Sequence, residues 1–105
     1  MSISREPLVE VVRAWEGEPG RSARRGCLVV TWEFHDTVVL SAATGVLTRA
    51  DLRALGAELL AAGVRTIRAW RCNGQRLPGG RCVLPGETHS LWEIDLPALM
   101  ARSAR

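Results

Sequence analysis

The sequence contains no lysine and no tyrosine, and phenylalanine and asparagine each occur once. All 14 basic residues are therefore arginines, which bind phosphate or carboxylate through paired hydrogen bonds where a lysine offers only a point charge. Codon bias in a GC-rich genome produces the same composition, so arginine content alone leaves both explanations open. The formal net charge of +3 permits contact with nucleic acid without requiring it.

Long apolar runs are also missing. Runs such as residues 28–30 and 38–40 are short, far below the roughly 20 residues that a membrane-spanning helix needs. No apolar leader is visible near the N-terminus, so we expect neither a secretory signal nor membrane contact, and a cytoplasmic location. A length of 105 residues and an apolar fraction of 47% fit one globular domain, residues 1–105.

Cysteine is scarce, with Cys27, Cys72 and Cys82 widely spaced and no Cys-x-x-Cys pair. An odd number of thiols argues against a disulfide framework, and zinc needs a fourth ligand that neither His35 nor His89 supplies at a suitable spacing. We expect buried apolar thiols and no metal. The Gly/Pro-rich turn between Cys72 and Cys82 predicts that these two thiols face each other.

Three strands are expected in the first 45 residues. Residues 8–15 are rich in valine and place Val9, Val11 and Trp15 on one face. The Gly, Pro and charge content of residues 16–26 then indicates an exposed loop.

Residues 27–34 predict a second strand, and a tight turn at His35 and Asp36 returns residues 37–42 as a third, antiparallel strand. An isolated meander of this size is marginally stable, so one of its faces should be covered. The second strand aligns the apolar residues Leu28, Val30, Trp32 and Phe34 on one side.

A helix over residues 48–62 supplies that cover. Thr48 is a good N-cap and Asp51, three residues later, approximates a capping box. Gly63 stands where a left-handed C-terminal cap belongs. Gly56 costs up to about 1 kcal/mol against alanine unless close packing requires it. The apolar face consists of Leu52, Leu55, Leu59 and Leu60.

Residues 64–70 can be interpreted in two ways, and their β-branched content with Trp70 favours a strand. Turn residues follow, and residues 81–84 and 91–95 predict two further short strands. Residues 96–101 predict a short helix that Asp95 caps.

The second interpretation is a helix. The segments 57–60, 65–70 and 77–78, followed by residues 81–99, resemble the excisionase and MerR-like winged helix-turn-helix families over about residues 57–99. In those families the second helix enters the major groove of DNA.

This resemblance implies a recognition helix at residues 64–74 with Arg65, Arg68 and Arg71 facing DNA. It differs from the family pattern at the turn, where residues 61–63 read Ala-Ala-Gly instead of Gly-Val-Ser.

Neither of two reaction classes is supported by a motif. The element order resembles the central part of the GNAT acyltransferase fold, but residues 43–50 offer only Gly45 for a pyrophosphate loop, so no acyl-coenzyme A or other cofactor is expected. A Cys/His hydrolase requires a thiol and a base brought together, and the sequence shows no such pairing. The candidate residues are Cys27 or Cys82 with His35 or His89.

We therefore expect a single small α+β domain with a mainly antiparallel sheet, in the order strand-strand-strand-helix-strand, and one main helix packed on one face. The expected function is non-enzymatic: an accessory, regulatory or inhibitor protein that binds another protein, with no small-molecule substrate. A winged-helix DNA-binding regulator is the alternative. The residues expected to contact the partner are Arg21, Arg24, Arg25, Arg65, Arg68, Arg71 and Trp70.

Overall fold

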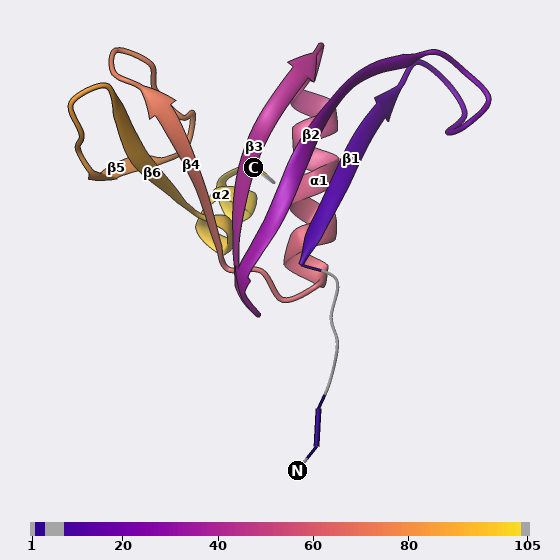
Figure 1. Ribbon diagram of the computed structural model, residues 1–105. Coiled ribbons are helices and arrows are strands. Elements are labelled where there is room, and N and C mark those ends of the chain that lie inside the picture. The colour runs from indigo at the N-terminus through magenta and orange to yellow at the C-terminus, as the bar shows by residue number, and fades with distance from the viewer. Residues whose placement is uncertain (1, 4–7, 104–105) are drawn as a thin grey trace.

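The computed structural model describes residues 2–3 and 8–103, which form six strands and two helices (Figure 1). The predicted order strand-strand-strand-helix-strand accounts for only the first five elements, and a β-hairpin and a second helix follow them. The expectation of one main helix is therefore met only in part, because a second helix joins the first. The elements are β1 (Val9–Trp15), β2 (Arg24–Phe34), β3 (Thr37–Gly45), α1 (Arg49–Ala61), β4 (Thr66–Cys72), β5 (Arg81–Leu84), β6 (His89–Asp95) and α2 (Leu96–Ser103).

All six strands lie in one mixed sheet with the order β1-β2-β3-β4-β6-β5. The pairing is antiparallel between all neighbours except β3 and β4. These two strands run parallel and pair only over residues 37–39 and 66–68, which we call the parallel seam. Beyond the seam they diverge (Figure 1). A parallel pair needs a crossover connection, and α1 provides it.

The N-terminal meander is longer than expected. β2 begins at Arg24, inside the predicted loop, and β3 continues to Gly45. The two strands pair as far as Gly26 and Gly45. Glycine and arginine at these positions suggested a loop, but glycine also permits two backbones to approach closely, which extends the ladder here.

Helix α1 has the ends that its sequence predicts. The Thr48 side chain accepts a hydrogen bond from the Asp51 amide, and the Asp51 carboxylate accepts one from the Thr48 amide, which completes the capping box. At the other end Val64 N donates to Leu59 O at 2.9 Å, and Gly63 has φ of 95°. This pattern is a Schellman motif, which satisfies the last carbonyl groups of the helix.

Both helices cover the same face of the sheet (Figure 1). α2 begins after Asp95, whose carboxylate accepts a hydrogen bond from Ala98 N at 3.2 Å, as predicted for a cap. α2 packs on α1 at Gly56, where an added Cβ would lie 3.1 Å from Met100 Sδ. Close packing therefore explains this glycine. The buried core comprises Leu28, Val30, Val38, Leu55, Leu59, Val64, Ile67, Ile94 and Leu96.

Residues 66–72 form strand β4, as their β-branched content favoured. The strand pairs with β3 on one side and β6 on the other. The recognition helix that the winged helix-turn-helix interpretation needs at residues 64–74 is thus not formed. Because side chains alternate along a strand, Arg68 and Arg71 point to opposite faces of the sheet instead of to one groove-facing surface.

Candidate protein-interaction face

The sheet face turned away from both helices is not covered by any element of residues 2–3 and 8–103, and we call it the open face (Figure 1). Val38 and Ile67 pair across the seam and are buried under the helices, so the next pair, Val39 and Arg68, points to the open face. Paired residues of neighbouring strands lie on the same face, so the registers of the other strand pairs assign the remaining paired residues to the open face or to the helix-covered face. The apolar members of the open face are Val9, Val11, Val29, Val39, Trp70, Leu84 and Leu91.

Four valines form one group on β1, β2 and β3. Val11 pairs with Val29, and Val9 and Val39 both pair with Thr31 on the strand between them. We call Val9, Val11, Val29 and Val39 the valine patch. Val9 and Val11 are 58% and 49% exposed. A solvated sheet face normally carries polar side chains, so a contiguous apolar patch here is a candidate contact surface.

The valine patch ends at an unpaired strand edge. Leu8 O accepts a hydrogen bond from Trp32 N at 2.7 Å, and ladder bonds alternate along an antiparallel pair. The backbone groups of Val9, Val11 and Arg13 consequently point away from β2, and no other strand of the described residues meets them. Exposed edges of this kind recruit further strands.

An ion-pair cluster stands beside the valine patch. Arg68 Nε donates to Glu93 Oε2 at 2.8 Å, and Arg68 Nη1 lies 3.6 Å from Glu33 Oε1. All three side chains are about one-fifth to one-third exposed. The cluster joins β2, β4 and β6 across the seam and places one arginine between two glutamates, so it leaves one negative charge in excess at the centre of the open face.

A second apolar group lies beyond this cluster. Trp70 pairs with Leu91, which also pairs with Leu84 on β5. Trp70 is 53% exposed. It therefore occupies a surface position of the kind that anchors protein interfaces, where tryptophan and arginine are enriched.

The seven residues predicted to contact a partner do not lie on one surface. Arg68 and Trp70 are on the open face, whereas Arg71 lies on the helix-covered side with its Nε buried and without a hydrogen-bond partner among the described residues. Arg21 is exposed in the β1–β2 loop, Arg24 is exposed at the start of β2, and Arg65 is exposed before β4.

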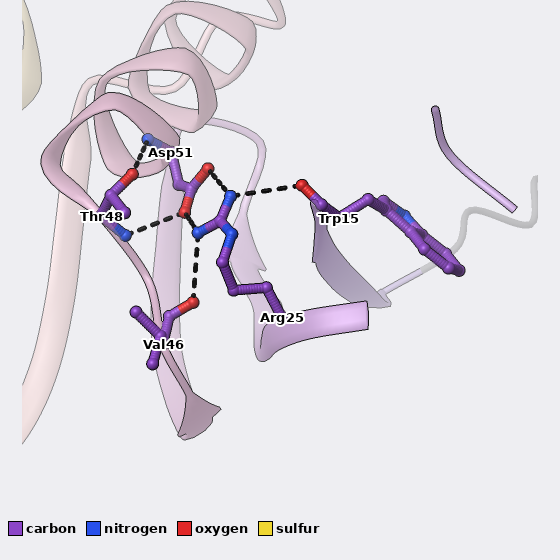
Figure 2. Close-up of polar contacts among 5 residues, drawn as sticks. All are labelled: Trp15, Arg25, Val46, Thr48 and Asp51. Atoms are coloured by element: carbon purple, nitrogen blue, oxygen red, sulfur yellow. Dashed lines mark hydrogen bonds and ion pairs between the residues drawn. The ribbon is translucent and has the colours of Figure 1, made fainter. Parts of the chain in front are cut away.

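Arg25 is the seventh of these residues, and Figure 2 shows that it is engaged inside the molecule. Its guanidinium binds both carboxylate oxygens of Asp51, with Nη2 2.8 Å from Oδ1. It also donates to Val46 O and Trp15 O, each at 3.4 Å. Arg25 thus ties β2 to the start of α1.

This pairing changes the acid–base properties of both groups. The hydrogen bonds from Arg25, with a further one from the Thr48 amide, hold the pKa of Asp51 well below its ordinary range. The same carboxylate raises the pKa of Arg25. At the N-terminus of α1, where the GNAT-like order would place a pyrophosphate, the Asp51 carboxylate already accepts a hydrogen bond from the Thr48 amide and is paired with Arg25.

The thiols differ from the prediction. Cys72 and Cys82 are exposed and Cys27 is half-buried, so none belongs to the buried core. β6 lies between the strands that carry Cys72 and Cys82, so these residues do not face each other. Cys72 instead pairs with His89, a combination that the sequence analysis missed because cross-strand register cannot be read from spacing.

Other classes of site have less support in the described part of the chain. A shallow depression of about 250 Å³ lies between β1 and α1, but its lining is mainly apolar and its Asp51 is engaged by Arg25. Residues 2–3 and 8–103 contain no group of three or more His, Cys, Asp or Glu side chains placed to hold a metal ion. Neither described helix is both long and apolar enough to cross a membrane.

Sequence reasoning did not single out the valine patch as a candidate site. The alternation of Val9 and Val11 was visible, but it indicates only a strand with one apolar face and does not show whether a helix covers that face. Comparisons of the chain with protein-family models, curated proteins and solved structures found no match.

Proposed function

We propose that this chain is a non-catalytic protein-binding module, and that the protein it binds is a second copy of the chain, added at strand β1. The observation that carries this proposal is the continuity of the valine patch with the unpaired edge of β1. An apolar surface supplies burial, and the adjacent backbone edge supplies directional hydrogen bonds. The opposite edge, β5, has only four residues and is less suited to pairing.

The edge of β1 is compatible with its own copy in an antiparallel arrangement. With Val11 opposite the partner's Val11, Val9 pairs with the partner's Arg13. Every outward-pointing backbone group from Val9 to Arg13 then meets a complementary group. The register ends before the irregularity between Ala14 and Trp15.

A two-fold axis perpendicular to the sheet generates this pairing. It keeps the helices of both copies on the same side, and it brings the two valine patches together into one apolar surface. Glu10 stays on the helix-covered side, where its carboxylate accepts a hydrogen bond from Trp32 Nε1 at 2.7 Å. No like charges are placed directly opposite each other.

Light scattering coupled to size-exclusion chromatography tests the assembly. The chain should have the mass of a dimer at high concentration and dissociate on dilution. Val11→Lys places a charge on the patch and on the edge, so it should yield a monomer. The matched control is Val46→Lys, because Val46 is 61% exposed but lies outside the sheet. This variant should dimerise like the unaltered chain.

Amide hydrogen exchange gives an independent measurement on the backbone itself. In a monomer the amides of Val9, Val11 and Arg13 should exchange rapidly, while the amide of Val12, which points to β2, is protected. In the dimer all four should be protected. A chain that stays monomeric at every concentration, or a Val11→Lys variant that dimerises as well as Val46→Lys, would overturn the proposal.

A further inference from the structure

One cysteine has a histidine within hydrogen-bonding distance. Cys72 and His89 pair across β4 and β6, and Cys72 Sγ lies 3.1 Å from His89 Nε2. The other ring nitrogen, Nδ1, lies 3.1 Å from Thr88 Oγ1. Both Cys72 and His89 are exposed, so a small molecule can reach the pair directly.

The loop that leads into His89, the first residue of β6, is fastened to the residue next to Cys72. Asn73 Nδ2 donates to the carbonyl oxygens of Gly86 and Glu87 at 2.8 and 2.9 Å. Ser90 Oγ donates to Asn73 Oδ1 at 2.6 Å. A Cβ on Gly86 would lie only 2.2 Å from His89 O, so the loop conformation requires glycine. These contacts hold the backbone that leads into His89 against Asn73, the neighbour of Cys72.

The arrangement suits removal of the thiol proton. When Nδ1–H donates to the Thr88 hydroxyl, the lone pair of Nε2 faces Cys72 and can accept its proton. The resulting thiolate is the nucleophilic form of cysteine. The other two thiols have no such neighbour among the described residues: Cys27 Sγ contacts Thr44 Oγ1 at 3.0 Å, and Cys82 pairs with Trp92.

We propose that Cys72 is a modification site that forms mixed disulfides with small disulfide-containing molecules, with His89 as the base. His89 Nε2 takes the thiol proton, and Cys72 Sγ attacks one sulfur of the disulfide. The sulfur–sulfur bond of that molecule breaks while a new bond forms to Sγ, and the departing thiolate recovers the proton from His89. The disulfide is reduced and Cys72 is oxidised, so no other oxidant is needed.

The mixed disulfide should persist. Release by an internal thiol would require a second cysteine beside Cys72. Cys82 lies on β5, beyond β6, and pairs with Trp92, whose partner Ala69 is buried under the helices. Cys82 therefore points to the opposite face of the sheet from Cys72, and cannot resolve the adduct without local unfolding.

Reaction of the full chain with glutathione disulfide tests the proposal, with each cysteine followed by peptide mass spectrometry. Cys82 serves as an internal control because it is also exposed. We expect Cys72 to react about tenfold faster than Cys82 or more, because general-base assistance contributes at least that much. In urea-denatured chain the two rates should become similar.

Variants of the neighbouring residues separate this chemistry from simple accessibility. His89→Gln keeps a polar side chain but cannot take up the proton, so the rate at Cys72 should fall by about tenfold or more, to that of Cys82. Thr88→Val should also lower the rate at Cys72, because it removes the hydroxyl that accepts the hydrogen bond from Nδ1–H. Equal rates for Cys72 and Cys82 in the folded chain, or an unchanged rate in folded His89→Gln, would overturn the assignment. It is independent of dimer formation, so Val11→Lys should leave the ratio of rates unaltered.

Discussion

Gly26 lies directly opposite Gly45 in the β2–β3 register, and neither position has room for a side chain. A Cβ on Gly26 would lie 2.5 Å from Val46 O, and one on Gly45 would lie 2.5 Å from Arg25 O. Gly45 also has φ of 71°, in the left-handed region that strains other residues. This close approach brings the chain that leads into α1 within reach of Arg25.

Replacing Gly45 should therefore lower the free energy of unfolding by more than the strain of its backbone conformation alone would. Gly74 is the matched control, because its φ is 94° and an added Cβ would meet nothing within 4 Å. Gly74→Ala should lose about 1 kcal/mol of unfolding free energy through strain alone. Gly45→Ala should lose more, because the clash with Arg25 O adds to that strain. Urea denaturation followed by tryptophan fluorescence measures both, and equal losses would show that the close approach has no energetic importance.

Asp51 should make the stability of the chain depend on acid pH. The folded state lowers the pKa of this carboxyl from an ordinary value of 3.8, mainly through Arg25. The unfolded chain then binds the proton more readily, so the stabilisation is complete above about pH 5 and is lost as the pH falls toward the folded-state pKa. Asp51→Asn should be less stable than the unaltered chain at neutral pH, and the two should converge in acid. A difference that stays constant down to the lowest accessible pH would contradict this assignment.

Docking of α2 on α1 should be weakened by a β-branched residue at position 56. Gly56→Val would place a branched side chain against Met100. Ala57→Val is the control, since Ala57 is exposed on the same helix and acquires the same side chain. Overpacking should cost Gly56→Val about 1–3 kcal/mol more than the control. Chemical denaturation gives the energies, and chemical shifts of residues 96–103 report whether α2 stays docked. Equal losses in the two variants would show that the contact contributes little.

Binding to duplex DNA should be weak and should disappear near physiological salt. Arginines scattered over both faces provide only general charge attraction, which counterion release makes strongly salt-dependent. Arg68→Ala should weaken binding no more than Arg76→Ala, because Glu93 and Glu33 already engage Arg68. Fluorescence anisotropy over a salt titration tests this. Salt-resistant binding that depends on Arg68 would instead support the DNA-binding alternative, with β4 and not a helix as the reading element.

The features that were predictable from the sequence are those fixed by neighbouring residues. Both caps of α1 and the cap of α2 depend on side chains within a few positions of the helix end. The strand at β4 followed from its β-branched residues and from Gly63, which ends α1 and turns the chain back to the sheet. In these places local preference and tertiary structure agree.

Long-range pairing was not predictable in the same way. The parallel seam joins residues 37–39 to residues 66–68, and nothing in either segment specifies the other. Apolar residues lie on both faces of the meander. Only packing decides that Leu28 and Val30 are covered while Val9 and Val11 are not. Arg25 was expected to bind a partner because an arginine in a Gly/Pro-rich segment resembles a loop residue. The extension of β2 instead placed it against Asp51.

The docking of α2 on α1 at Gly56 has a consequence for biosynthesis. The meander, α1 and β4 are synthesised before residues 96–100, since synthesis proceeds from the N-terminus. Until then, the buried sites that Leu96 and Met100 occupy on α1 remain open to water or to other nascent chains. The segment that closes the core is thus among the last of the described residues to be synthesised. Truncation upstream of Leu96 should therefore give a chain that exposes its core and requires chaperones.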